Sequence, residues 1–103
     1  MKRKIYVCAP LRDNDGKDVE RAMAYYKYAL KNDCVPVGPH ALAKMLEGVD
    51  LSKIRQAGMS LLWFCDEIWV FGDERTDSMQ EEILFGRNMK IRMRIIKEKE
   101  LKK

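Results

Sequence analysis

Two adjacent glutamates, Glu81 and Glu82, follow a polar stretch that separates an apolar segment from a helical pattern. Acidic residues in the first turn of a helix interact favourably with the helix dipole, and this interpretation requires no chemistry. The two side chains point in different directions, because adjacent helical residues are about 100° apart. Glu82, beside the apolar Ile83, is predicted to lean over the strand ends, where a carboxylate can act as a nucleophile or orient a sugar, while Glu81 is predicted to face solvent.

Hydrophobic periodicity predicts the elements that would position these side chains. Strand patterns cover 4–10, 34–38, 67–71 and 91–96, and helical patterns cover 18–31, 40–47, 51–65 and 77–89, the last capped by Asp77 or Ser78. Strands alternating with helices through short loops predict the α/β class, as a small Rossmann-like or flavodoxin-like three-layer fold with about four mainly parallel strands. The last strand alternates apolar residues with Arg92 and Arg94, which indicates an edge position, since central parallel strands are apolar on both faces.

Polar residues follow the first three strands, where such folds bind ligands. In an open parallel sheet the ligand lies beyond the carboxyl ends of the strands. These segments supply the candidate side chains Arg12, His40, Asp73, Ser78 and Glu82. None of the segments is a glycine-rich phosphate loop, so the sequence gives no support for ordinary dinucleotide or P-loop nucleotide binding.

The chain of 103 residues predicts one domain, which we place at 1–96, followed by a basic C-terminal tail at 97–103. Its core is modest, so a homodimer or higher assembly that buries more surface is expected. The longest nearly apolar run, 59–65, is too short to span a membrane, and the basic N-terminus leads into a strand rather than a signal peptide. Three cysteines without C-x-x-C spacing are expected to be buried free thiols of a cytoplasmic protein, not disulfides or metal ligands.

The net charge of +4 is concentrated at the C-terminus. From Lys90 onward there are seven basic and two acidic residues, a net charge of +5, against −1 for the residues before it. One interpretation is a tail that binds nucleic acid or a partner, and the other is a solvated, frayed terminus. No aromatic residues interleave these charges, which argues against a nucleic-acid surface.

Four segments together resemble the nucleoside 2-deoxyribosyltransferase-like superfamily. They are "IYVCAPLR", "PVGPH", "CDEIWVFGD" and "SMQEEI", and in this order they span roughly residues 4–95. The resemblance is greatest to a small branch, found in bacteria and phages and labelled DUF4406 or DUF7768. It implies a nucleoside or nucleotide ligand and needs neither a metal nor another cofactor.

The resemblance implies roles for residues of two segments. Tyr6 matches a tyrosine that hydrogen-bonds the catalytic glutamate. Glu82 matches that glutamate, the nucleophile in a pattern like G-M-x-x-E-[IL], in which Ser78 replaces the glycine and Met79 is the methionine. Ser78 and Met79 are accordingly expected beside the substrate.

Three further residues are expected to bind substrate. Arg12 stands where the deoxynucleoside monophosphate hydrolases have an arginine at the sugar-phosphate end, and His40 where they have a histidine after the second strand. Asp73 lies nine residues before Glu82, where transferases often have an aspartate in the base-binding loop. Each also has a plain alternative: a solvated arginine, a helix-capping histidine and an aspartate of a turn.

The implied reaction is a double displacement at the anomeric carbon. Glu82 attacks C1′ and releases the base, and water or another base then resolves the glycosyl-enzyme, as in retaining glycosidases. The enzymes carry an aspartate, eight residues before the acidic residue that starts the third strand, which helps protonate the leaving base. In this chain that position is Gly58, and loss of general-acid help typically costs about 10²- to 10⁴-fold in rate.

Three functions therefore remain open. The first is an enzyme that cleaves or exchanges the N-glycosidic bond. The second is a non-catalytic module of the same fold that captures a nucleotide or ADP-ribose-like metabolite as a sensor or sequestering protein, in a phage setting for example; Gly58 and Ser78 favour it, and the Tyr6–Glu82 pair favours the enzyme. The third, a nucleic-acid accessory protein, depends on the C-terminal charge alone.

Overall fold

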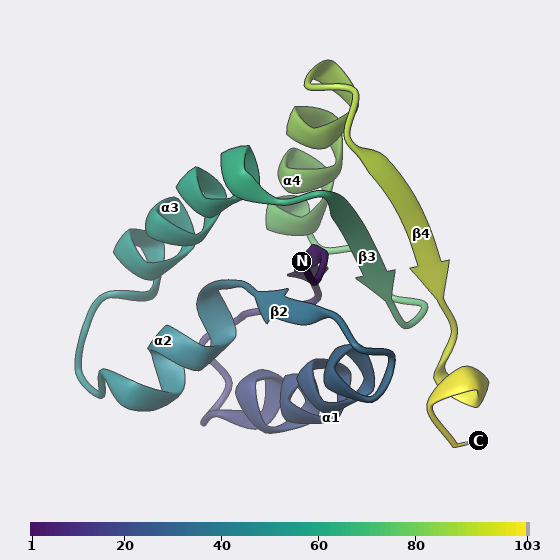
Figure 1. Cartoon of the computed structure of the whole chain (residues 1–103). Helices are drawn as coiled ribbons and strands as arrows, with labels where there is room; N and C mark the ends of the chain where they lie inside the picture. Colours follow the sequence, from purple (N-terminus) through teal and green to yellow (C-terminus); the bar gives the residue numbers. More distant parts are fainter. Residues whose placement is uncertain (103) are drawn as a thin grey trace.

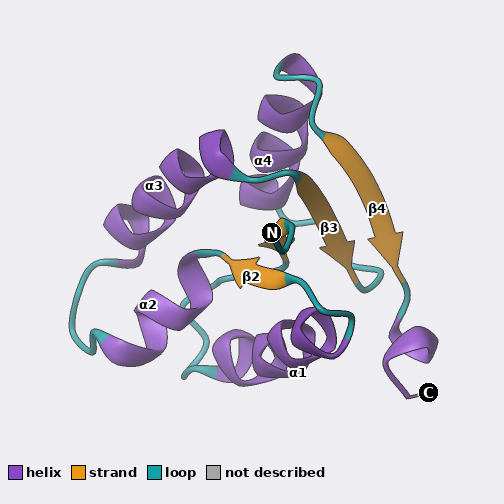
Figure 2. Cartoon of the chain, in the orientation of Figure 1, coloured by secondary structure: helices purple, strands orange, loops and turns teal. Residues whose placement is uncertain are grey.

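One four-stranded parallel sheet organises the chain (Figure 2). The computed structural model describes residues 1–102, so Lys103 of the expected basic tail lies outside the described part. The strands are β1 (Lys4–Cys8), β2 (Val35–Val37), β3 (Glu67–Phe71) and β4 (Arg92–Ile96), in the order β2-β1-β3-β4. The predicted α/β class is confirmed, and so is the edge position of the last strand.

The helices fill the connections between the strands. They are α1 (Lys17–Lys31), α2 (Pro39–Met45), α3 (Leu51–Leu61) and α4 (Asp77–Asn88), with 3₁₀ turns η1 (Leu62–Phe64) and η2 (Glu98–Lys102). In Figure 1, α1 lies below the sheet, and α3 and α4 lie above it. None of the helices in residues 1–102 combines the length and hydropathy of a membrane span.

The start of α4 differs from the expectation by one or two residues. Its cap is Thr76, not Asp77 or Ser78: the Thr76 hydroxyl accepts from the backbone N–H of Met79 at 3.3 Å. Thr76 has extended backbone angles and can cap, whereas Asp77 and Ser78 are already helical. The helix α3 begins at Leu51 as expected, and the Asp50 side chain caps it by accepting from the backbone N–H of Ser52.

Alternation along the strands divides the core into two clusters. Ile5 and Val7 of β1 join Trp69 and Phe71 of β3 on the face covered by α1. Tyr6 and Cys8 join Ile68, Val70 and Met79 on the face covered by α3 and α4, as the two-residue period of a strand requires. This second face is the one that carries the candidate site.

The basic tail packs against the α1 side of the sheet instead of fraying. Leu101 contacts the core cluster of that face. The Tyr25 hydroxyl donates to Glu98 at 2.6 Å, and Arg94 of β4 lies 3.7 Å from Glu100. The two acidic residues of the tail therefore fix η2 in place, which leaves its lysines toward solvent.

Candidate active site

Glu82 is the buried carboxylate of α4. Met79, Glu82 and Gly86 are the buried residues of that helix, and their three- and four-residue spacing puts them on the face that rests on the sheet. Glu82 is 6% exposed, whereas Glu81 is exposed. Glu82 thus faces the sheet and Glu81 faces solvent, as predicted.

Both oxygens of Glu82 have donors from β1. The Tyr6 hydroxyl donates to Oε2, and the Cys8 thiol lies 3.3 Å from Oε1. Tyr6 and Cys8 are both fully buried. The structure thus brings together the predicted pair Tyr6–Glu82 and adds Cys8, which the sequence analysis missed although alternation along the strand places it on the face of Tyr6.

The environment of Glu82 favours its protonated form. Burial raises its pKa to about 7, against an opposing effect of the hydrogen bonds from Tyr6 and Cys8. The neighbouring Glu81 raises the pKa further, and Arg55 lowers it. A carboxyl group of this kind is ionised in part near neutral pH, so it can act as a nucleophile or exchange a proton there.

A cleft of about 890 Å³ opens in front of Glu82. It lies between the loop after β1, the helix α3 and the first turns of α4. Its polar lining includes Arg12, Arg55 and Ser78, and Met59, Trp63 and Phe85 form its apolar wall. Trp63 and Phe85 meet edge to face with ring centroids 5.8 Å apart. The cleft has the size and mixed polarity of a small-molecule site.

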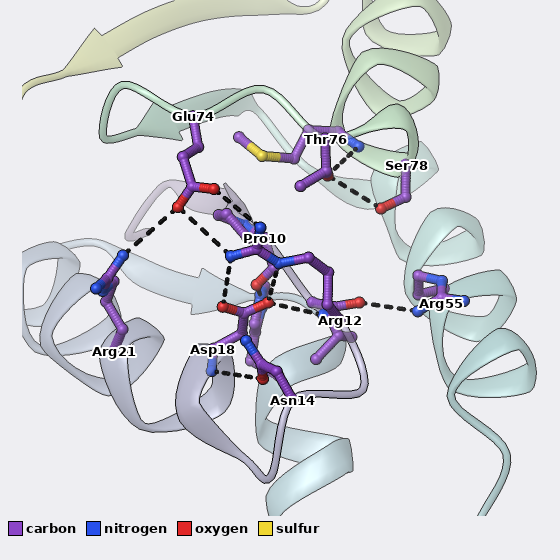
Figure 3. Close-up of polar contacts among 12 residues, drawn as sticks. Pro10, Arg12, Asn14, Asp18, Arg21, Arg55, Glu74, Thr76 and Ser78 are labelled. Carbon is purple, nitrogen blue, oxygen red and sulfur yellow. Dashed lines mark hydrogen bonds and ion pairs between the residues drawn. The ribbon is translucent and has the colours of Figure 1, made fainter.

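Arg12, in the loop after β1, connects this loop to the loop after β3 (Figure 3). Its guanidinium contacts the buried Asp18 through Nε at 2.9 Å and the exposed Glu74 through Nη1 at 2.9 Å. Arg21 of α1 lies 3.6 Å from the same Glu74. Arg12 holds the pKa of Asp18 at about 2, so this pair stays charged at any ordinary pH. The predicted Arg12 therefore lines the cleft, already paired with two carboxylates.

Arg55 is a second cation of the cleft that sequence reasoning missed. Its Nη1 donates to the Leu11 carbonyl oxygen at 2.8 Å, which joins α3 to the loop after β1 (Figure 3). Arg55 belongs to no motif, and only the tertiary arrangement places it in the same cleft as Glu82. Ser78, which was predicted, lies on the opposite wall with its hydroxyl 3.3 Å from that of Thr76 (Figure 3).

Three other predicted residues lie away from this cleft. His40 is 1% exposed, and its Nε2 is 3.0 Å from the Pro10 carbonyl oxygen. Burial lowers the pKa of His40, which favours a neutral imidazole that donates from Nε2. Met79 is fully buried in the core beneath α4. Asp73 is exposed and lines a separate hollow of about 200 Å³ on the other side of Glu74.

Gly58, at the position of the implied acid, is a packing residue. A Cβ there would lie 2.8 Å from Cβ and 2.9 Å from Cδ of Pro39, the first residue of α2. Both Gly58 and Pro39 are buried where α2 and α3 meet. A carboxylate at this position would have to displace a rigid ring, so the close approach of the two helices excludes it.

The residues of the chain also match a known family. Residues 3–96 match the sequence profile of a domain of unknown function, DUF7768. The chain belongs to the DUF7768 family. Comparison of this DUF7768 domain with curated proteins finds no match.

The DUF7768 fold is similar to that of a solved enzyme, 2-desoxiribosyltransferase from Leishmania mexicana, with a TM-score of 0.67 and 14% sequence identity. The alignment covers 92% of this chain and 64% of the enzyme, so the DUF7768 chain spans less than two thirds of the length of that protein. The fold that the resemblance implied is thereby confirmed. Within residues 1–102, no three His, Cys, Asp or Glu side chains gather as metal ligands.

The raised pKa of Glu82 predicts a pH-dependent stability. The folded chain holds the proton up to about pH 7, whereas the unfolded chain releases it near the ordinary value of 4.5. This stabilisation is fully present below pH 4.5 and is lost as the pH rises through 7. Relative to Glu82→Gln, the wild type should lose about 3 kcal/mol of unfolding free energy across this window.

Urea unfolding of both proteins across this pH range measures the difference. Glu47→Gln is the matched control, because Glu47 is exposed and is not among the groups that act on Glu82, so its curve should follow the wild type. Parallel curves for the wild type and Glu82→Gln would contradict the prediction.

The contact of Gly58 with Pro39 predicts an unusual effect of alanine. Gly→Ala inside a helix normally stabilises by about 1 kcal/mol. Gly58→Ala should instead destabilise by about 1–3 kcal/mol, because the new methyl group overlaps the Pro39 ring. Denaturant unfolding of Gly58→Ala, Pro39→Ala and the double variant measures the coupling. The alanine should cost less once the ring is absent; an equal cost in both backgrounds would show that the ring is not the cause.

Proposed function

We propose that this protein cleaves or exchanges the N-glycosidic bond of a nucleoside or nucleotide, with Glu82 as the nucleophile. The observation that carries the proposal is the buried Glu82 carboxylate, held by Tyr6 and facing a cleft of about 890 Å³. A buried carboxylate with a tyrosine behind it and open space in front suits attack on an anomeric carbon. Support comes from the fold, which is shared with a solved 2-desoxiribosyltransferase.

The reaction consists of two displacements. A carboxylate oxygen of Glu82 gives an electron pair to C1′ and forms an ester bond, while the C1′–N bond breaks and its electron pair leaves with the base. The base takes up a proton from water. A water molecule then adds to C1′, loses a proton and releases the Glu82 carboxylate; a second base in place of water gives exchange. The positive charge that develops on the sugar is stabilised by the ionised Glu82 beside it.

The other cleft residues fit substrate binding. Ser78 offers a hydroxyl at the mouth of the cleft, and Arg12 and Arg55 offer positive charge to a sugar or a phosphate. Arg12 can keep its buried partner Asp18 and exchange the exposed Glu74 for an anionic ligand. His40 and Met79 do not reach the ligand in this arrangement. His40 holds the loop after β1 through the Pro10 carbonyl oxygen, and Met79 packs α4 onto the sheet. Asp73 reaches a ligand only where the ligand extends past Glu74.

A second candidate is a binding module without turnover. Gly58 favours it, because no acid stands there to protonate the leaving base. An enzyme that relies on water for this proton is expected to be slower by about 10²- to 10⁴-fold. The same cleft would then hold a nucleotide or an ADP-ribose-like metabolite for sensing or sequestration.

Release of free base decides between the two functions. A panel of deoxynucleosides and their 5′-monophosphates is incubated with wild type, Glu82→Ala and the matched control Glu47→Ala, at an exposed glutamate outside the cleft. Glu82→Ala should lose about 10³-fold or more of the rate, as expected for a nucleophile, while Glu47→Ala stays near wild type. The wild-type rate should rise with pH through about 7, because the ionised carboxylate attacks. Calorimetric binding without base release would favour the module, and the absence of both would contradict the proposal.

We also propose a homodimer that covers the part of the cleft lined by Trp63. Trp63 and Phe64 follow α3 with 61% and 70% of their surface exposed, and adjacent exposed aromatics mark an interaction surface. The small core gives such a monomer a reason to bury more surface. The three free, buried cysteines fit the reducing cytoplasm in which we place the protein.

Light scattering tests the dimer. The wild type should give twice the chain mass of 12.1 kDa, and Trp63→Glu should shift it to the monomer mass. Leu30→Glu is the matched control, because Leu30 is 60% exposed on α1 at the opposite face of the sheet. A monomeric wild type, or equal effects of both variants, would contradict this interface.

A further inference from the structure

Cys8 contacts the Glu82 carboxylate, and the proposed reaction assigns it no role. It lies two residues after Tyr6 on β1, so both side chains point toward α4. Its Sγ is 3.3 Å from Oε1 of Glu82, and Tyr6 binds the other oxygen, Oε2. The carboxylate is thus held at two points, which determines both its position and the orientation of its plane.

The two donors approach Glu82 from the sheet side. Glu82 lines the cleft, but neither Tyr6 nor Cys8 does, and both have no exposed surface. A ligand in the cleft would therefore meet the carboxylate without touching either donor. Whatever these two residues do for the reaction, they do through Glu82.

We propose that Cys8 is a positioning residue, whose thiol holds Oε1 of Glu82 so that the carboxylate stays aimed into the cleft; its effect on catalysis rests on the proposed function. A single hydrogen bond from Tyr6 would let the carboxylate turn about that contact, whereas a second donor prevents this rotation. Thiols are weak donors, so Cys8 orients Oε1 while it withdraws little of the electron density needed for attack.

The surroundings keep Cys8 a donor. Burial raises the pKa of the Cys8 thiol, with the negative charge of Glu82 as the next cause, so the proton stays on sulfur. Burial likewise raises the pKa of Tyr6. The Met79 carbonyl oxygen, 3.8 Å from Sγ, is a second acceptor to which the thiol can turn when Glu82 is protonated.

The charged groups around Glu82 and Cys8 come from α4 itself, from α3 and from the loop before α4. Glu81 on α4 raises its pKa and Arg55 on α3 lowers it, while Arg75, in the loop before α4, acts on Cys8. Substitutions at position 8 leave all three in place. A change in the titration of Glu82 in such variants therefore reports the contact with position 8.

The test compares Cys8→Ala with Cys8→Ser. Loss of the donor in Cys8→Ala should raise the pKa of Glu82 by roughly 0.5–1 unit, and the stronger hydroxyl donor of Cys8→Ser should lower it. A ¹³C NMR titration of the labelled glutamate carboxyl groups measures this without any need for turnover, and Glu82→Gln identifies the signal. In base release, Cys8→Ala should lower kcat by about 3- to 30-fold with KM unchanged, because the attacking group is less well aimed.

Cys34→Ala is the matched control. Cys34 is an equally buried thiol, 1% exposed, on the opposite face of the sheet, so its loss should leave the Glu82 titration and kcat unchanged. A shift in both Cys8 variants in the stated directions supports the positioning role even where no base is released, in which case the proposed function is the part that fails. Unchanged Glu82 titration in Cys8→Ala, or equal shifts in Cys34→Ala, overturns it. Should Cys8→Ala not fold, a folded Cys8→Ser decides by the direction of its shift.

Discussion

A carboxylate that is taken out of water needs partners, and the burial of Glu82 sets requirements on the elements around it. An isolated buried carboxylate would simply hold its proton, so ionisation near neutral pH depends on the donors that β1 provides. Tyr6 and Cys8 can reach Glu82 because α4 packs on the sheet through the face that carries Met79, Glu82 and Gly86 and contacts β1. The order of the strands places β1 beside β3, and α4 follows β3, so this order brings the two donors of β1 to the carboxylate of Glu82.

The loops that follow β1 and β3 must also be held in place, because they form the edge of the candidate site. Their ends diverge into helices that leave opposite faces of the sheet, as at other switch points where such folds bind ligands. Arg12 bridges them through one buried carboxylate, Asp18, and one exposed carboxylate, Glu74. The buried contact keeps the arginine in place, and the exposed one is screened by solvent and is the easier to exchange. Contacts within the chain therefore hold both loops in place.

Most of the fold could be predicted from the sequence, because it depends on local patterns. The strand at 67–71 and the edge position of the last strand follow from apolar runs and alternation, and the directions of Glu81 and Glu82 follow from helix geometry. The cap of α4 was missed because three consecutive residues, Thr76 among them, can all cap a helix, and only the backbone angles separate them.

The contributors to the site from outside any motif could not be predicted in the same way. Arg55 reaches the cleft from α3 and Glu74 pairs with Arg12 across 62 residues of chain, so both depend on tertiary contacts that no local pattern encodes. The same reason explains Asp73: its neighbour Glu74 pairs with Arg12, whereas Asp73 lines a hollow outside the cleft, and spacing alone does not distinguish the two.

Gly58 shows how packing and chemistry compete for one position. The approach of α2 to α3 stabilises the layer above the sheet and holds His40, which follows Pro39, against the loop after β1. The same approach leaves no room for a side chain at residue 58, and so excludes the implied proton donor from that position of α3. Glu82 keeps its orientation, because the donors that aim it come from β1 and not from α3. In the proposed reaction, attack and leaving-group protonation would thereby be separable: the first would depend on the strand beneath the cleft, the second on the helix beside it.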